Sequence, residues 1–122
     1  MTTRIPAARL RLKRAYEPPA RGDGTRILVD RLWPRGLRKE DAALDDWLKD
    51  VAPSPTLRKW FGHDPERWSE FRRRYTRELG AHAEQLENIR ALARAGTVTL
   101  VYGARDEEHN HALVLRDALL KA

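Results

Sequence analysis

The spacing of apolar and polar residues predicts three β-strands. In the first, Leu10 and Leu12 alternate with basic residues, a pattern typical of a strand with one solvent-exposed face. Residues 27–29 (Ile-Leu-Val) are short and wholly apolar, which favours a buried central strand. Residues 97–102 (Thr-Val-Thr-Leu-Val-Tyr) form the clearest strand pattern in the chain.

The long segment between the second and third strands carries helical spacing. Four apolar residues recur at positions i, i+3, i+4 and i+7 and predict a first helix: Leu44, Trp47, Leu48 and Val51. Ser54-Pro55 and Asp64-Pro65 each combine an N-cap with proline at the first helical position, so they predict two further helices. A fourth helical pattern follows before the third strand.

These elements occur in the order strand, strand, a block of helices, strand, helix. Asp106 is the expected N-cap of the last helix, which runs to about Lys121. A strand that returns to its sheet through helices usually does so in parallel, so we expect the second and third strands to be parallel neighbours. The predicted fold class is α/β, with a small, mainly parallel three-stranded sheet, room for one extra edge strand, and four to five packing helices.

Length predicts a single domain over residues 1–122, because this is close to the commonest domain size. Residues 1–8 have the composition of a loose N-terminal segment. The direction of the first strand stays open, since the short link in residues 17–25 fits a hairpin better than a helical crossover.

Composition excludes several classes of protein. The chain has no cysteine, which removes a disulfide framework, a thiolate nucleophile and a Cys-based zinc site. No apolar stretch approaches the roughly 18 residues of a transmembrane helix, and no apolar run follows the first residues. We therefore expect a cytoplasmic protein that does not interact with membranes.

Positive charge is concentrated in the first third of the chain. The formal net charge is +6, and residues 1–38 carry ten basic and three acidic residues. Arginine makes up 19 of the 24 cations, which reflects either a GC-rich genome or the binding of an anion. Arginine suits the second interpretation, because its planar fork matches the geometry of phosphate and carboxylate.

A first group of candidate site residues directly follows the predicted central strand. It consists of Asp30, Arg31, Trp33 and Arg35, and charged residues at this place are hard to explain by packing alone. Two guanidinium groups on one turn can bind phosphate or carboxylate through paired hydrogen bonds. Trp33 can wall a pocket or stack on a base. The structural alternative is that Asp30 and Arg31 form ion pairs and Trp33 covers the core.

A second group follows the last predicted strand, in residues 102–108. A strand, a glycine turn and a helix start present free backbone N–H groups to an anion, and Gly103 and Ala104 allow close approach. Tyr102 and Arg105 flank this turn. The string matches neither a Walker loop nor a dinucleotide fingerprint, and its three successive acidic residues would repel an anion.

Two histidines, His109 and His111, complete the candidate chemistry. Residues two apart on a helix point about 200° apart, so this pair cannot chelate one metal ion, and no metal or cofactor is expected. His111 is a candidate general acid or base, and the alternative is a structural histidine bonded to a backbone carbonyl. His63, beside Asp64, is interpreted as the neighbour of a helix cap.

Three strings along the chain carry a resemblance to a known family. Residues 24–36 (Gly-Thr-Arg-Ile-Leu-Val-Asp-Arg-Leu-Trp-Pro-Arg-Gly), 99–106 (Thr-Leu-Val-Tyr-Gly-Ala-Arg-Asp) and 110–115 (Asn-His-Ala-Leu-Val-Leu) are similar to the YeaO-like family of uncharacterised bacterial proteins. The resemblance covers nearly the whole chain. It implies a set of motif residues: Asp30, Arg31, Trp33, Pro34, Arg35, Tyr102, Asn110 and His111.

The resemblance supplies no reaction, because the family is uncharacterised. Longer relatives in the superfamily carry cysteine near the positions of Gly103 and Asn110-His111, and shorter members show Ser and Lys in place of Gly103 and Arg105. If such a residue is a nucleophile in relatives, this chain cannot use it at position 103.

These observations predict an arginine-rich pocket that binds a phosphorylated or nucleotide-like anionic small molecule. The predicted ligand-binding residues are Arg31, Trp33, Arg35, Tyr102, Arg105 and Asn110. Asp30 and His111 are the catalytic candidates, and the sequence leaves open whether a reaction follows binding.

Two alternatives from other classes stay open. The first is a nucleic-acid-binding module that uses the basic N-terminal third. The second is a non-catalytic interaction domain, which would expose a large apolar patch. The sequence is compatible with a monomer and with a homodimer.

Overall fold

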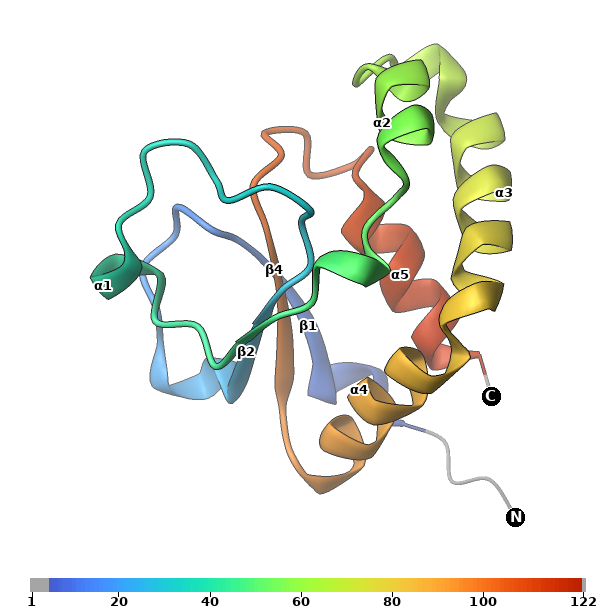
Figure 1. Ribbon diagram of the computed structural model, residues 1–122. Helices are drawn as coiled ribbons and strands as arrows, with labels where there is room; N and C mark the ends of the chain where they lie inside the picture. Colours follow the sequence, from blue (N-terminus) through green and yellow to red (C-terminus); the bar gives the residue numbers. More distant parts are fainter. Residues whose placement is uncertain (1–4, 122) are drawn as a thin grey trace.

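The sheet of this protein has four parallel strands. The computed structural model describes residues 5–121. Its strands are β1 (Leu10–Arg14), β2 (Thr25–Leu28), β3 (Asp46–Trp47) and β4 (Val98–Tyr102), in the order β1-β4-β2-β3 (Figure 1). The predicted small parallel sheet is confirmed, and β3 is the extra edge strand.

The first strand is parallel to its neighbour, which answers the question of direction that the sequence left open and excludes the hairpin that the short link favoured. β4 lies between β1 and β2, because Leu10 and Thr25 are both register partners of Val98. The link from β1 to β2 instead returns along the sheet through one 3₁₀ turn at Arg21–Asp23. Since the strands are parallel, the C-terminal ends of β1, β2 and β4 meet at one edge, where open α/β sheets bind ligands.

Gly24 is required where this link enters β2. Its φ is +63°, and a Cβ at this position would lie 2.1 Å from the carbonyl oxygen of Thr97. The N–H of Thr25 donates to the same oxygen at 3.0 Å. Glycine is the residue that combines this positive φ with so close an approach of two backbones.

Helices cover one face of the sheet and form the main core. They are α2 (Pro55–Phe61), α3 (Trp68–Leu79), α4 (Ala83–Ala95) and α5 (His111–Leu120) (Figure 1). Ile27, Leu100 and Tyr102 point to this face from the strands. α3 contributes Phe71 and Tyr75, as the helical spacing of its aromatic residues predicts.

Of the three predicted N-caps, Ser54 and Asp64 cap the elements that follow them, and Asp106 does not cap the last helix. Ser54 is the N-cap of α2, and its Oγ accepts the N–H of Leu57 at 3.2 Å. Asp64 also accepts a backbone N–H, and it begins the 3₁₀ turn that leads into α3. The expected start of the last helix at Asp106 is wrong, because Asn110 is the N-cap of α5.

Asp106 caps a turn of the preceding loop instead. Its Oδ1 accepts the N–H groups of Glu108 and His109 at 2.8 and 3.0 Å. A carboxylate that accepts backbone N–H groups is as favourable in an isolated turn as at a helix start, so the local signal does not distinguish the two.

The opposite face of the sheet is covered by loops and by the short helix α1 (Lys39–Ala42). The sequence predicted a helix over residues 44–51, and this is wrong: Asp46–Trp47 form β3 and Lys49–Val51 form a 3₁₀ turn. The first two apolar residues of that segment pack into a small cluster on this face, and the last two pack into the main core. The spacing of the four apolar residues resembles that of a helix because the segment contributes side chains to both faces of the sheet.

A buried charged cluster also lies on this second face. Arg26 of β2 donates to Asp23 Oδ2 at 2.6 Å and to the carbonyl oxygen of Ala42 at 2.8 and 3.2 Å. Lys13 Nζ lies 3.1 Å from the same carboxylate oxygen, and the side chains of Asp23 and Arg26 are 3% and 5% exposed. The two buried charges are therefore paired with each other and with backbone groups.

The outward edge of β1 is largely occupied by the chain itself. The N–H of Leu10 donates to the carbonyl oxygen of Ala7, and Arg116 Nε donates to the carbonyl oxygen of Leu10 at 2.6 Å. At the other end of the strand, the N–H of Arg14 donates to the Glu17 carboxylate and its carbonyl accepts the N–H of Glu17. The backbone groups of two outward-facing residues of this edge strand, Leu10 and Arg14, thus have hydrogen-bond partners.

Of the segment over residues 1–8 that the sequence predicts to be loose, the structure describes residues 5–8. Residues 1–4 lie outside the described part of the chain. Ile5 is buried against the main core, and Ala7–Arg9 form a 3₁₀ turn. Among the described residues, no helix has the length and apolar character needed to span a bilayer.

Candidate functional site

Two loops meet at the C-terminal edge of the sheet. The loop after β2 and the loop after β4 are joined where the N–H of Gly103 donates to Asp30 Oδ2 at 2.8 Å. A Cβ at position 103 would lie 3.0 Å from that oxygen, so glycine makes this approach possible. The predicted meeting of residues 30–35 with residues 102–111 is confirmed.

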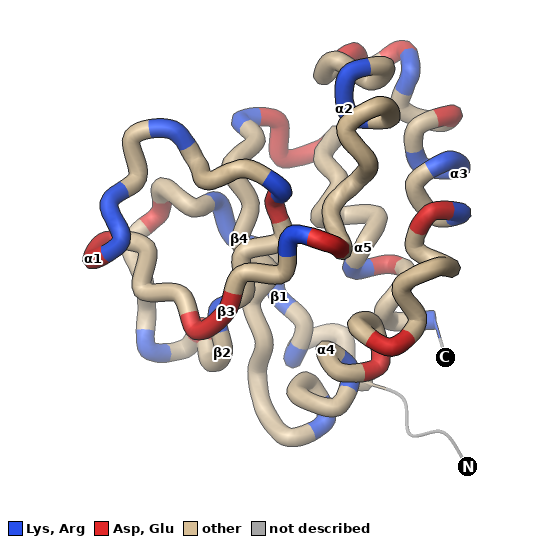
Figure 2. Tube along the Cα trace, in the orientation of Figure 1, with Lys and Arg blue, Asp and Glu red and all other residues tan. Residues whose placement is uncertain are grey.

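These loops, α2 and α3 enclose a cavity of about 440 Å³, which is within the usual size range of small-molecule sites. Its charged lining is strongly unbalanced. Three arginines and three histidines face a single carboxylate, that of Asp30; the basic residues are Arg31, Arg35, Arg58, His63, His109 and His111. Figure 2 shows basic positions along the loop that follows β2. The lining of the cavity therefore carries an excess of basic over acidic side chains.

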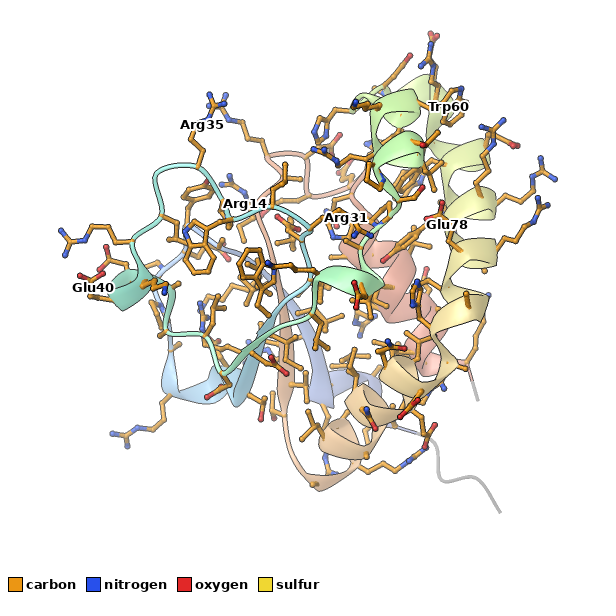
Figure 3. All side chains as sticks on the ribbon, viewed as in Figure 1. Arg14, Arg31, Arg35, Glu40, Trp60 and Glu78 are labelled. Atoms are coloured by element: carbon orange, nitrogen blue, oxygen red, sulfur yellow. The ribbon has the colours of Figure 1, made fainter. Side chains whose placement is uncertain are left out.

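Arg31 lies half-buried in this cavity without a carboxylate partner among the described residues. Its Nε donates to the carbonyl oxygen of Pro53, and one terminal nitrogen donates to that of Ala52, both at 3.3 Å. Figure 3 shows Arg31 between the loop and the segment that precedes α2, with Glu78 directed from α3 to the same segment. Glu78 holds that segment by accepting the N–H and hydroxyl of Ser54.

Asp30 and His111 form a contact between β2 and the start of α5. His111 Nε2 lies 2.9 Å from the carbonyl oxygen of Val29 and 3.2 Å from Asp30 Oδ1. Both neighbours are acceptors, so Nε2 carries the proton and donates. The carbonyl is its better partner, and Asp30 Oδ1 is buried without a hydrogen bond to any described residue. The structural alternative for His111, a bond to a carbonyl, is thus confirmed, although the residue also lines the cavity.

The other cationic side chains of the cavity are more exposed. Arg35 projects from its loop into solvent in Figure 3, and its carbonyl oxygen accepts the hydroxyl of Tyr16 at 2.8 Å. Arg58 is on the exposed side of α2, and its side chain forms no hydrogen bond or ion pair with another described residue. Both guanidinium groups are free to turn towards an anion.

Trp33 lines the cavity, but its polar group points into the protein. Its Nε1 donates to the carbonyl oxygen of Leu37 at 2.7 Å, and its ring meets the edge of Trp47 with 5.4 Å between centroids. The ring belongs to the small apolar cluster on the second face of the sheet. Its contacts favour the predicted role of a wall.

The remaining predicted residues are divided between the lining and its surroundings. Asn110 lines the cavity, is buried, and caps α5. Tyr102 and Arg105 are outside the lining, since Tyr102 packs into the main core and Arg105 is exposed on the loop. Burial raises the pKa of Tyr102, and the nearby carboxylate of Glu107 adds to this effect.

His109 is oriented by contacts on two sides. Its Nδ1 lies 2.9 Å from Asp106 Oδ2, and its ring meets the edge of Trp68 with 5.4 Å between centroids. The hydrogen bond from the N–H of Glu108, with those from His109, keeps the pKa of Asp106 below its ordinary value despite partial desolvation. Asp106 is therefore a carboxylate that orients one of the cavity histidines.

Aromatic side chains of α2 and α3 form the apolar wall of the cavity. Phe61 and Phe71 stack with 4.3 Å between ring centroids, and Tyr75 stacks on Phe71 from the next turn. The Tyr75 hydroxyl donates to the carbonyl oxygen of Val51, and burial raises its pKa well above the ordinary value, with the charges of Glu78 and Asp30 adding to the shift. The wall is thus backed by a buried tyrosine whose hydroxyl is hydrogen-bonded.

Several residues of the lining were not among the predicted site residues, including Tyr16, Arg58 and Phe61, and His63 was interpreted only as the neighbour of a helix cap. The αL conformation of His63 (φ +58°) has a weak sequence signal, because His63 follows the glycine that ends α2. Tyr16 follows β1, and Arg58 and Phe61 belong to α2. Their placement beside the two loops depends on the direction of β1 and on the path of the chain after β3. Among the described residues, no group of acidic, histidine and cysteine side chains has the arrangement of a metal site.

Comparison with known proteins decides the family. The family model described as "Inactive DUF488-N3 subclade" matches residues 9–122. The chain belongs to this family. The DUF488-N3 match agrees with the predicted resemblance to YeaO-like proteins, since the chain is 44% identical over 110 residues to the uncharacterized protein YeaO of Escherichia coli. That alignment covers 90% of this chain and 96% of the relative.

Two further DUF488-N3 relatives come from mycobacteria. The uncharacterized proteins Mb3100c of Mycobacterium bovis and Rv3073c of Mycobacterium tuberculosis are each 46% identical over 111 residues, which is 91% of this chain and 93% of each relative. No solved structure matches the chain.

Proposed function

We propose that this protein binds a phosphorylated small organic molecule in the cavity between β2, β4 and α2, and that it does so without catalysing a reaction. Arg31 is the central ligand-binding residue. Arg58 and Arg35 are placed at the rim, where they can close on the anion, and His111 and His109 complete the basic lining.

The half-buried and uncompensated charge of Arg31 carries the proposal. A buried or half-buried cation is costly unless an opposite charge accompanies it. The two carbonyl bonds of Arg31 are long, at 3.3 Å, and they orient the guanidinium group without neutralising it. A phosphate that accepts the remaining N–H groups would supply both the charge and the paired geometry that arginine favours.

Binding without chemistry is favoured by the groups that surround Arg31. Position 103 is glycine, which offers no nucleophile. One Asp30 oxygen accepts the N–H of Gly103, and the proton of His111 Nε2 is directed at a backbone carbonyl. These two residues therefore hold the loops together, and the description of the subclade as inactive is in keeping with this role.

The alternative of a nucleic-acid-binding module receives no comparable support. That alternative depends on Arg9, Arg11, Lys13 and Arg14, and Lys13 is already paired with Asp23. None of these four side chains lines the cavity, so they share no enclosed site with Arg31.

Titration calorimetry with inorganic phosphate and ribose 5-phosphate tests the proposal. We expect both to bind wild type, and Arg31→Ala to weaken binding by about tenfold or more, because a charge-assisted hydrogen bond contributes roughly 1.5–3 kcal/mol. Arg58→Ala should weaken binding less, because that side chain is exposed.

Matched controls come from neighbouring cations outside the lining. Lys59→Ala removes a charge from the same helix as Arg58, and Arg105→Ala removes one from the loop after β4. Both should bind as wild type does. The proposal is wrong if neither probe binds at millimolar concentration, or if the two control variants lose as much affinity as Arg31→Ala.

A further inference from the structure

Exposed apolar side chains gather at the mouth of the cavity. Among the described residues, the large hydrophobic side chains that are exposed are Tyr16 at 45%, Leu32 at 58% and Leu92 at 44%. Tyr16 and Leu32 both line the cavity, from two different strand ends, while Leu92 lies on α4. Exposed apolar groups beside a cluster of cations are typical of a site whose ligand has an apolar part as well as a charge.

The ring of Tyr16 is held in place by two contacts. Its hydroxyl donates to the carbonyl oxygen of Arg35 at 2.8 Å, and the Arg14 guanidinium carbon lies 5.3 Å from the ring centroid. Arg14 is itself fixed, because its Nε donates to the carbonyl oxygen of Ala104 at 2.9 Å. A fixed aromatic ring that stays nearly half exposed loses little conformational entropy when a second ring stacks on it.

We infer that Tyr16 and Leu32 form a platform for a planar ring, so that the ligand is a phosphomonoester of the nucleoside monophosphate class. This inference rests on the proposed function, since the cationic lining must hold the phosphate. The cavity of about 440 Å³ has space for more than a phosphate group. The ring of Trp33 packs into the small apolar cluster, and Phe61 and Phe71 are buried and stack on each other, which leaves Tyr16 as the exposed ring of the lining.

Calorimetry with three probes, namely inorganic phosphate, ribose 5-phosphate and adenosine 5′-monophosphate, tests the inference. Stacking of one base on an aromatic side chain is worth about 5- to 150-fold in affinity, so we expect the nucleotide to bind wild type more tightly than ribose 5-phosphate by a factor in this range. Tyr16→Ala should remove this preference and leave the affinity for ribose 5-phosphate unchanged.

Two variants separate stacking from structural effects. Tyr16→Phe keeps the ring and loses the bond to Arg35, so it should retain most of the preference for the nucleotide. Leu92→Ala removes an exposed hydrophobic side chain far from the cavity and should change nothing. Circular dichroism and thermal unfolding check that each variant is folded.

The outcomes distinguish this inference from the proposed function. If ribose 5-phosphate binds and the nucleotide binds no more tightly, the platform is wrong and the phosphate site stands. A preference that survives Tyr16→Ala also overturns the platform. If none of the three probes binds wild type, both the platform and the proposed function are wrong.

Discussion

Two groups of charged residues lie on different parts of the same sheet, and they differ in how completely their charges are satisfied. On the loop-covered face, Asp23, Arg26 and Lys13 are paired with one another and with backbone groups. At the C-terminal edge, Arg31 meets only carbonyl oxygens, and one oxygen of Asp30 has no hydrogen bond to any described residue. The charges of the first group are paired within the chain, whereas those of the second are only partly satisfied.

In a chain that is rich in arginine, this difference gives a criterion for recognising a candidate binding site. Several arginines here serve the fold: Arg90 and Arg116, for example, donate to backbone carbonyl oxygens at 2.9 and 2.6 Å. Other arginines lie on the surface of α3, where acidic and basic positions alternate, and Arg73 and Arg74 bond to Glu70. Basic charge alone therefore indicates little, and charge left unneutralised inside a cavity indicates a binding site.

The largest expected effect comes from breaking the paired group. Asp23→Ala leaves Arg26 buried without its partner, so we expect unfolding free energy to fall by about 3–5 kcal/mol. Denaturant titration measures the loss. The exposed pair of Arg38 and Asp41 provides the control, since Arg38→Ala should cost less than about 1 kcal/mol. Equal losses in the two variants would show that the buried group is not a structural requirement.

Lowering the pH tests the same group without a substitution, and the expected loss of stability is smaller. Burial raises the pKa of Asp23, but the N–H of Ala20 and the bonds from Lys13 and Arg26 outweigh it and bring the pKa below the ordinary value of 3.8. A carboxyl group whose pKa is lower in the folded chain stabilises the fold above its unfolded value, and this stabilisation is lost as the pH falls through the folded value. Wild type should therefore lose stability below about pH 4.

The variant Asp23→Asn isolates this contribution from that of other carboxylates. It should be less stable than wild type at neutral pH, and its stability should fall less steeply between about pH 5 and pH 2, because it has no proton to take up at this position. Denaturation at a series of pH values measures both slopes. Identical slopes would mean that Asp23 has the same pKa in the folded and unfolded chains.

The smallest effect on stability is expected from the partly satisfied group. Arg31→Ala removes a half-buried charge whose two hydrogen bonds are long, so we expect a change of less than about 1 kcal/mol, even though phosphate binding is lost. Thermal unfolding with and without ribose 5-phosphate measures the two effects together. A loss of stability as large as that of Asp23→Ala would place Arg31 among the structural arginines.

Much of the site was predictable because it depends on short sequence patterns and on the rule that strands connected through helices are usually parallel. The apolar residues 27–29 and 97–102 predict two strands, and a connection through helices makes them parallel. Their C-terminal ends then bring Asp30 and Gly103 to the same edge. The N-cap signals of Ser54 and Asp64 were also sufficient, because a cap is satisfied by N–H groups within three residues of it.

The parts that were not predictable depend on packing between distant segments. Tyr16 reaches the cavity because β1 is parallel to β4, and the short link after β1 favoured the opposite direction. Trp47 has helical spacing with Val51, but the two side chains lie in different clusters, one on each face of the sheet. Asp106 forms good bonds to backbone N–H groups in a turn, so its sequence signal does not identify where α5 begins.

The occupied edge of β1 has a consequence for the behaviour of the protein at high concentration. An open parallel sheet of this kind would ordinarily offer its outer strand to a neighbouring molecule, and growth of that kind leads to insoluble fibres. Here Arg116 and Glu17 bond to the backbone at either end of the strand, and at the opposite side β3 has two residues only. Both edges of the sheet therefore offer little continuous free backbone to which a strand of another molecule could pair.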